Sequence, residues 1–411
     1  MTSSLQPAET SKMKNWKQLF YLSIVLCVFA IGYFFTRNGE RIGDEPFHYS
    51  QILDILQGSD LFPRQCPYLP GYHWSLAILC KLGHSCSGSF MRLLSSSLSF
   101  LCVLSFFGLS KKIEKDSSVQ KLFSFSLFPA FFPFFFLVYT DIYSMFYVFL
   151  AFFFALDKRL WLSGFFGILS LLVRQNNIVW LVFIMAVVYF EEYYPQYRWS
   201  DVKKWIFKYL FFFLALALFG VFVLWNKGFV LGDKGNHWVS FSFGNSLLFL
   251  FFFFFLFLPQ NLSNAKKIGQ LLLRKKWVWP LLTALVIIHM HYFQQRHLYN
   301  TEVAIWHNVP LVFAKRSVLL RLAFFLPVAY ALLSLCVTPF KKRFFYLLYP
   351  FALLSLLPLP VIEIRYIFLP FAFFILFKPK DSPRVAVATF LIDVAIILPA
   401  MYSMIKYHTI L

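Results

Sequence analysis

Long apolar runs recur along almost the whole chain, separated by short polar segments. The first covers about residues 16–35, and further runs follow at residues 90–109, 122–139, 141–156, 159–173, 178–190, 205–225, 245–258, 277–292, 318–337, 343–358, 364–377 and 385–405. A helix needs about 20 apolar residues to cross a bilayer, so the pattern predicts about thirteen membrane-spanning helices. Runs shorter than about 17 residues are typical of tilted, re-entrant or broken helices. Pro129 and Pro133 predict a kink in one of them.

The composition supports an all-α integral membrane protein, a polytopic helical bundle. Of the 411 residues, 60% are hydrophobic, 14% are charged and 57 are Phe. A soluble domain is about half apolar and about a quarter charged, so this chain has too little polar surface to be covered by water alone. We expect a cytosolic tail over residues 1–15 and one transmembrane domain over residues 16–411.

The positive charge is distributed as in a membrane protein. The net charge is +20, but most Lys and Arg residues lie in short clusters between apolar runs, so nucleic acid is not the expected partner. Under the positive-inside rule these clusters face the cytosol, together with the N-terminus. No small-residue cleavage site follows the first run, which predicts a retained first helix. Residues 36–90 then form the first non-cytosolic loop.

The opposite face receives the mixed acidic, basic and amide groups. Ionisable groups at the edge of a bilayer are costly, so clusters of them are candidate functional sites. The candidates are Asp44, Glu45, His48, Asp141, Arg174, Gln175, Asn176, Asn177, Asp233, Lys234, His237, Glu363 and Arg365.

Residues 43–48, Gly-Asp-Glu-Pro-Phe-His, directly follow the first span. The adjacent carboxylates of Asp44 and Glu45 suit a cation or a general base. Neighbouring residues of a helix point in different directions, so one carboxylate is expected to react and the other to position. The simpler alternative is a solvated acidic turn.

Three further segments combine polar groups. Residues 174–177, Arg-Gln-Asn-Asn, offer many hydrogen-bond donors to a phosphate or to sugar hydroxyls, or simply end a helix. Residues 228–237 are Gly-rich and end in groups that suit a phosphate, or they form a flexible connector. Arg365 begins an apolar run and is expected to pair with a phosphate or with a carboxylate, for which Glu363 is the simplest partner.

Several kinds of chemistry are not indicated. The six cysteines form no CxxC pair and no His/Cys motif is evident, so we expect neither a metal nor a cofactor. Cys66, Cys80 and Cys86 can form a bridge in an oxidising compartment, although free thiols are the simpler expectation. No stretch alternates strands and helices as a soluble nucleotide-sugar enzyme requires. If a sugar is transferred, its donor should therefore be a membrane lipid.

Six short stretches, taken in order, resemble the dolichyl-phosphate-glucose α-1,2-glucosyltransferases, which add the last glucose to the lipid-linked oligosaccharide of N-glycosylation. They are residues 44–48 (DEPFH), 69–72 (LPGY), 139–145 (YTDIYSM), 174–180 (RQNNIVW), 230–237 (VLGDKGNH) and 363–366 (EIRY). The resemblance implies a C-type glycosyltransferase fold in the endoplasmic reticulum membrane with a lumenal active site; a bacterial inner-membrane relative with a periplasmic site is the alternative.

The resemblance also implies an acidic catalytic base after the first helix, which by position is Asp44 or Glu45. We expect inverting transfer of a hexose from a lipid phosphate to a lipid-linked glycan. Donor-binding residues would be Arg174, Gln175, Asn176, Asp233, Lys234, His237 and Arg365; orienting or acceptor-binding residues would be His48, Asp141 and Glu363. The rival interpretation is a transporter or lipid flippase, which predicts an internal repeat and polar groups near the midplane; neither is evident.

Overall fold

The computed structural model describes residues 6–59, 62, 66–193, 202–294, 297–301 and 309–408, and within these ranges it contains helices and no strand. The α-helices are α1 (Gln6–Thr36), α2 (Glu45–Gln57), α3 (Gly71–Leu82), α4 (Gly88–Ile113), α5 (Ser118–Ser126), α6 (Thr140–Leu156), α7 (Leu160–Val173), α8 (Ile178–Tyr193), α9 (Val202–Lys208), α10 (Leu210–Asn226), α11 (Gly244–Leu256), α12 (Leu258–Ser263), α13 (Ala265–Arg274), α14 (Val278–Tyr292), α15 (Leu298–Thr301), α16 (Val309–Arg316), α17 (Val318–Val337), α18 (Leu348–Leu356), α19 (Phe368–Phe377) and α20 (Pro383–Tyr407). Short 3₁₀ turns are η1 (Lys115–Ser117), η2 (Phe132–Phe135), η3 (Gln175–Asn177), η6 (Arg343–Leu347) and η7 (Ile364–Ile367).

The predicted all-α membrane architecture is confirmed at a coarse level. Within the described part of the chain, four helices are long and apolar enough to cross a bilayer: Trp16–Thr36, Gly88–Ile113, Val318–Val337 and Pro383–Tyr407. Shorter apolar helices of 10–17 residues include Thr140–Leu156, Leu160–Val173, Leu210–Asn226, Gly244–Leu256, Val278–Tyr292, Arg343–Leu356 and Ile364–Phe377. The number of about thirteen spans stays a prediction.

The apolar run at residues 122–139 is broken rather than kinked. Helix α5 ends at Ser126, a separate 3₁₀ turn covers Phe132–Phe135, and the next α-helix begins at Thr140. Pro129 and Pro133 lack the amide donors that a continuous helix needs, and each disfavours helical backbone in the residue before it. The aromatic side chains of the break are nonetheless buried, so this segment fills the centre of the bundle.

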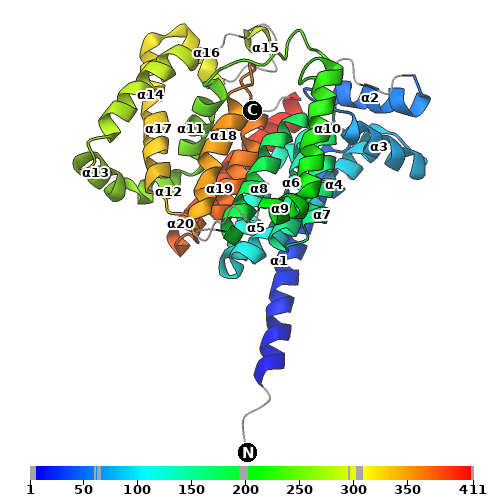
Figure 1. Cartoon of the computed structure of the whole chain (residues 1–411), viewed down its shortest axis with the longest axis horizontal. Helices are drawn as coiled ribbons and strands as arrows, with labels where there is room; N and C mark the ends of the chain where they lie inside the picture. Colours follow the sequence, from blue (N-terminus) through cyan, green and yellow to red (C-terminus); the bar gives the residue numbers. More distant parts are fainter. Residues whose placement is uncertain are drawn as a thin grey trace, which may run out of the picture.

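Helix α1 runs past the bundle and marks its two ends (Figure 1). In the first half of α1, Gln18 accepts a hydrogen bond from Lys111, and at the C-terminal end the carbonyl of Thr36 accepts one from Arg92. The end that Gln18 marks also gathers Lys-rich ion pairs, namely Lys112–Asp157, Lys121–Glu114 and Lys341–Glu114. The mixed acid–base clusters lie at the other end, which we call the Asp44 end.

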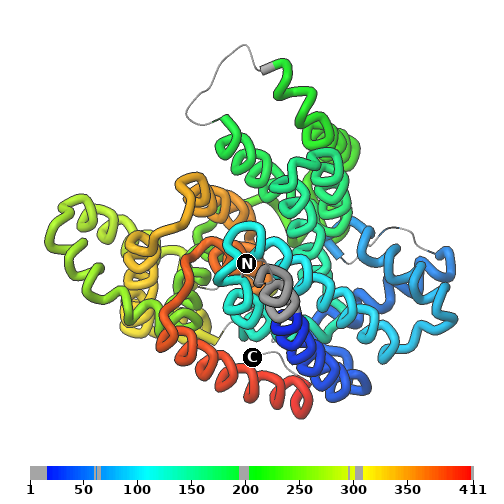
Figure 2. Tube along the Cα trace, turned by 90° about the horizontal axis from the view of Figure 1, so that it is seen from below, coloured from blue at the N-terminus to red at the C-terminus, as the bar shows by residue number. Residues whose placement is uncertain are grey.

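Aromatic rings fill the interior between the helices. Phe106 stacks on Phe125 and Phe345 stacks on Phe377, each with ring centroids 4.1 Å apart. Helix α6 packs between α4 and α7. Viewed from below, α2 and α3, α8 to α10, and α11 to α17 extend from this centre in three different directions (Figure 2). The site residues therefore lie where separate groups of helices meet.

One disulfide fastens the loop between α3 and α4. Cys80 and Cys86 are bonded with their Cα atoms 5.0 Å apart, whereas Cys66 is free and buried. The expectation of free thiols was therefore wrong for Cys80 and Cys86. Their six-residue separation closes a tight loop at the Asp44 end.

Candidate functional site

Asp44 lies in a turn whose shape depends on the residue before it. Gly43 has a φ of 60°, a left-handed conformation that costs a residue without a Cβ atom little. A Cβ atom there would collide with the hydroxyl of Tyr139. That hydroxyl donates to the carbonyl of Ile42 at 3.0 Å and accepts from the amide of Asp44 at 2.7 Å. Tyr139 therefore fixes the backbone that presents the Asp44 carboxylate.

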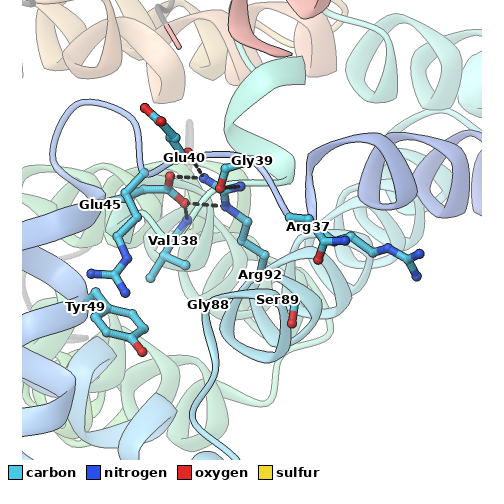
Figure 3. A pocket seen from close by; sticks show the side chains of 11 residues that line it. Arg37, Gly39, Glu40, Glu45, Tyr49, Gly88, Ser89, Arg92 and Val138 are labelled. Carbon is cyan, nitrogen blue, oxygen red and sulfur yellow. Dashed lines mark hydrogen bonds and ion pairs between the residues drawn. The ribbon is translucent and has the colours of Figure 1, made fainter. Parts of the chain in front are cut away.

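Glu45 is the first residue of α2, and its carboxylate is enclosed. It accepts hydrogen bonds from the amides of Ile42 and Val138, each at 2.9 Å. Two nitrogens of Arg92 also donate to it (Figure 3). The same guanidinium donates to the carbonyls of Gly39 and Glu40. Both side chains are almost fully buried, with exposed fractions of 4% for Arg92 and 2% for Glu45. This closed pair ties α4 to the segment after α1.

Asp44 belongs to a different ion-pair network. Its Oδ2 lies 2.8 Å from a terminal nitrogen of Arg365, which is itself paired with Glu363 and lies 3.7 Å from Asp141. The Arg365 side chain is 2% exposed, whereas that of Asp44 is 17% exposed. The Asp44 carboxylate is therefore the more accessible partner of a buried cation.

Arg174 extends this network from the break between α7 and α8. Its guanidinium pairs with Asp141, donates to the hydroxyl of Tyr68 and lies 4.2 Å above the Tyr68 ring. Asp141 thus stands between Arg174 and Arg365. Residues from the α2 turn, α6, the α7–α8 break and η7 meet in one cluster, and the predicted Asp44, Asp141, Arg174, Glu363 and Arg365 are all part of it.

A mainly apolar cavity of about 230 Å³ adjoins this cluster. Its lining includes Tyr68, Tyr366, Gln175, Asn176 and His237, with apolar walls from Phe219, Phe229, Trp238 and Leu354. Among the described residues, the amide oxygens of Gln175 and Asn176 are buried and accept no hydrogen bond. A buried acceptor without a donor is costly, so these oxygens suit the hydroxyl groups of a bound molecule.

The Gly-rich loop, residues 228–237, forms part of the cavity wall through Phe229, Val230 and His237. Asp233 accepts from Tyr299 and Asn236 and lies 3.4 Å from His237, so it organises the loop. Burial lowers the pKa of His237, although Asp233 opposes the effect. Lys234 is exposed and donates to the carbonyl of Asn226 at 2.7 Å, and it is not among the described residues that line the cavity.

His48 lies on α2 and faces α3. Its Nδ1 is 2.9 Å from Nε2 of His73, and the sulfur of Cys66 lies 3.9 Å from the same Nδ1. Burial lowers the pKa of His48 to about 3, and the charges of Arg365 and Arg174 add to the effect. Burial also raises the pKa of the Cys66 thiol to about 12. Both groups are therefore neutral at pH 7.

Sequence reasoning missed Arg92, Tyr68 and the pair Cys66 and His73. Arg92 lies within an expected transmembrane run, and 47 residues separate it from Glu45. The one available signal was the cost of a guanidinium inside an apolar run. Tyr68 and His73 flank the short Leu-Pro-Gly-Tyr stretch, which indicated a family motif but no contact.

Fold and site together define a polytopic helical membrane protein with a buried acid–base cluster and an apolar cavity at one end. The model of the DIE2/ALG10 family matches residues 38–200 and 194–376. A relative from Arabidopsis thaliana named Dol-P-Glc:Glc(2)Man(9)GlcNAc(2)-PP-Dol alpha-1,2-glucosyltransferase is 24% identical over 87% of this chain and 91% of its own length. A Homo sapiens protein of the same name is 26% identical over 80% of this chain and 82% of its own length.

A shorter match reaches higher identity. The Candida glabrata protein of the same name is 33% identical over 27% of this chain and 25% of its own length. The family model covers well over half of the 411 residues, so the chain belongs to the DIE2/ALG10 family. The family resemblance predicted from the short motifs is confirmed.

Proposed function

We propose that this chain is a membrane glucosyltransferase that moves glucose from dolichyl phosphate to a lipid-linked glycan and forms an α-1,2 linkage. Its relatives of similar length have names that describe this donor, acceptor and linkage. Family membership and these names confirm the predicted glycosyltransferase class. The observation that carries the site assignment is the partly exposed Asp44 carboxylate on the buried Arg365, next to a cavity with two unpaired amide oxygens.

The cavity suits the donor. Apolar walls match the first part of a lipid chain, and the amide oxygens of Gln175 and Asn176 match hydroxyls of the sugar. His237 lies on the same lining and, being neutral, can exchange a hydrogen bond with a phosphate or a sugar. Lys234 and Asp233 then act through the loop they stabilise.

Asp44 is the proposed general base. It takes the proton of the acceptor hydroxyl while the acceptor oxygen bonds to the anomeric carbon of glucose. The bond from that carbon to the phosphate oxygen breaks in the same displacement, with inversion, and dolichyl phosphate leaves with the electron pair. Glu45 is already saturated with hydrogen bonds, so its part is to hold the start of α2.

Arg365 and Arg174 are the proposed cations for the departing phosphate. Charge develops on the phosphate as the glycosidic bond breaks, and preorganised cations in a water-poor site stabilise it strongly. In the free enzyme Asp44, Asp141 and Glu363 hold these guanidinium groups in place. When Asp44 accepts the proton it loses its charge, which frees Arg365 to bind the phosphate more tightly.

The site is proposed to face the lumen of the endoplasmic reticulum. The Lys-rich ion pairs lie at the end that Gln18 marks, as the positive-inside rule requires of a cytosolic face. The Cys80–Cys86 disulfide lies at the Asp44 end, and disulfides persist in oxidising compartments.

A reconstituted transfer assay tests this proposal. Purified chain in detergent receives dolichyl-phosphate glucose and a lipid-linked glycan that ends in glucose, and the product is analysed for a new α-1,2-linked glucose. We expect transfer from this donor and none from a soluble nucleotide sugar.

The matched variants are Asp44→Asn and Asp157→Asn. Asp44→Asn should lower the rate by about 10²–10⁴-fold, the usual contribution of a general base. Asp157 is a partly exposed carboxylate paired with Lys112 at the opposite end, so Asp157→Asn should keep the wild-type rate. Full activity of Asp44→Asn would disprove the base assignment, and transfer from the nucleotide sugar alone would disprove the donor.

A further inference from the structure

A compact group of nitrogen and sulfur ligands lies beside the Asp44 turn. His48, Cys66 and His73 each offer one ligand atom, and these atoms all lie within 4.8 Å of one another. The three side chains are buried, with exposed fractions of 1%, 5% and 0% in that order. Nothing in the proposed transfer reaction uses Cys66 or His73. Their position therefore calls for a separate explanation.

We propose that His48, Cys66 and His73 bind a zinc ion between α2 and α3. Imidazole nitrogen and thiolate sulfur are the ligands that zinc prefers, and three protein ligands with one open position is an arrangement that zinc sites use. No spacing motif indicated this site, because Cys66 lies 18 positions and His73 lies 25 positions after His48.

The distances agree with one central ion. Tetrahedral bonds of about 2.0 Å to nitrogen and about 2.3 Å to sulfur place pairs of ligand atoms about 3.3–3.6 Å apart. Nδ1 of His48 lies 2.9 Å from Nε2 of His73 and 3.9 Å from the sulfur of Cys66, so small side-chain rotations bring all three to these separations.

The local charges also admit a cation that binds a thiolate. Zinc replaces the proton of a thiol, so the ion and its thiolate together add a single positive charge. Arg365 and Arg174 lie close enough to act electrostatically on His48. Asp44 and Glu363 pair with Arg365, and Asp141 pairs with Arg174, so these carboxylates offset both cations.

Such an ion would hold two segments of the site together. Cys66 precedes Pro67, whose carbonyl accepts hydrogen bonds from the side chain of Gln175 and from the amide of Leu231. His48 lies one helical turn after Asp44. Zinc would therefore join the Asp44 turn to the segment on which the cavity and the Gly-rich loop rest.

Metal analysis of the full-length protein tests the proposal without any sugar substrate. The protein in detergent is incubated with zinc chloride, freed of excess metal by gel filtration and analysed by mass spectrometry for metals. We expect about one zinc per chain, and about a tenfold or greater loss in Cys66→Ser and in His73→Gln. Because zinc content is the readout, the result stands apart from the success of the transfer assay.

The controls are a buried cysteine and a buried histidine elsewhere in the bundle. Cys102→Ser in α4 and His289→Gln in α14 should keep the wild-type zinc content. A thermal unfolding curve shows which variants remain folded, and Cys66→Ser changes the side chain so little that it keeps the test valid if His73→Gln unfolds.

Cobalt provides a second readout. Cobalt bound in place of zinc should give a sulfur-to-metal charge-transfer band that Cys102→Ser keeps and Cys66→Ser loses. Absence of zinc from the wild type, or zinc retained by the triple variant His48→Gln, Cys66→Ser and His73→Gln, would overturn the proposal. In the first case the three side chains form only a hydrogen-bonded cluster.

Discussion

Asp44 and Glu45 are neighbours in the chain, but their carboxylates belong to two very different networks. Glu45 accepts four hydrogen bonds, two of them from Arg92. The same guanidinium also donates to the backbone carbonyls of Gly39 and Glu40. Among the described residues, Asp44 forms an ion pair with Arg365 alone, and its side chain is 17% exposed. The Glu45 side chain is 2% exposed and already accepts four hydrogen bonds, whereas the Asp44 side chain is 17% exposed.

This difference separates a structural role from a chemical one. A saturated buried pair gains nothing from a substrate and is strongly disturbed when one partner is removed. A partly exposed carboxylate on a buried cation can take up a proton while the cation keeps another carboxylate partner, here Glu363 on Arg365. We therefore propose a folding role for the Glu45–Arg92 pair and proton transfer for Asp44.

The largest expected effect is on stability, in the closed pair. Arg92→Met leaves the Glu45 carboxylate buried without its cation, which should destabilise the protein by about 3–5 kcal/mol. Thermal unfolding in detergent, followed by intrinsic fluorescence, measures the change. Adding Glu45→Gln to Arg92→Met should recover part of the stability, because the unpaired charge is gone while the amide oxygen still accepts from a backbone amide.

The control for that prediction is a partly exposed pair at the opposite end. Lys112 and Asp157 have exposed side-chain fractions of 28% and 33%, and Lys112→Met should cost at most about 1 kcal/mol. If Arg92→Met unfolds at the same temperature as Lys112→Met, the buried Glu45–Arg92 pair contributes no more to stability than the partly exposed Lys112–Asp157 pair.

The next largest effect is on catalysis, in the open network. Arg365→Lys keeps the charge but loses the planar fork that contacts Asp44 and Glu363. We expect kcat to fall by about 10²–10³-fold, the usual loss when a preorganised donor to a developing negative charge is removed. Steady-state transfer kinetics measure this, and the unfolding temperature should change far less than in Arg92→Met. A normal kcat together with a large loss of stability would show that Arg365, like Arg92, has a structural role and no catalytic one.

The smallest effect is expected at the edge of the cavity. His237 is neutral at pH 7 because burial lowers its pKa, so His237→Gln replaces one neutral hydrogen-bonding group by another. The rate should fall by about 2-fold to 10-fold, the value of one hydrogen bond, and the pH profile above pH 7 should keep its shape. A profile that changes shape above pH 7 would show that His237 acts as a charged group.

The same pKa shift predicts a small dependence of stability on pH. The unfolded chain protonates a histidine near pH 6.5, whereas folded His237 resists the proton, so the wild type loses stability as the pH falls below that value. His237→Gln should lose less over the same range. Unfolding temperatures of both proteins between pH 7 and pH 5 measure the difference.

Sequence reasoning reached the membrane class, the family and the gathering of the polar clusters. The long helices were predictable because an apolar run of bilayer length has few other uses, as Val318–Val337 shows. The ordered short motifs identified the family because each is weak but their sequence along the chain is specific. The broken run at residues 122–139 showed only as two prolines, because apolar composition does not distinguish a helix from a buried irregular segment.

The contacts within the site were beyond the sequence. Nothing local distinguishes Asp44 from Glu45 as the reactive acid, because the difference comes from Arg92 and Val138, which are distant in the chain. The grouping of Cys66 with His48 and His73 likewise arises only when α3 folds back against α2. The sequence pattern indicates which polar side chains lie at the same end of the helical bundle. Three-dimensional packing decides which of them remain accessible to a substrate.

Gly43 shows how a residue with no reactive group can govern a catalyst. Gly43 has a left-handed backbone and no side chain, so the Tyr139 hydroxyl can lie against it. There the hydroxyl donates to the carbonyl of Ile42 and accepts from the amide of Asp44. A Cβ atom at position 43 would collide with that hydroxyl, so we expect even Gly43→Ala to disturb the turn that carries Asp44. The orientation of the Asp44 carboxylate therefore depends on the absence of a side chain at position 43. We expect substitutions at Gly43 to be tolerated as poorly as substitutions at Asp44 itself.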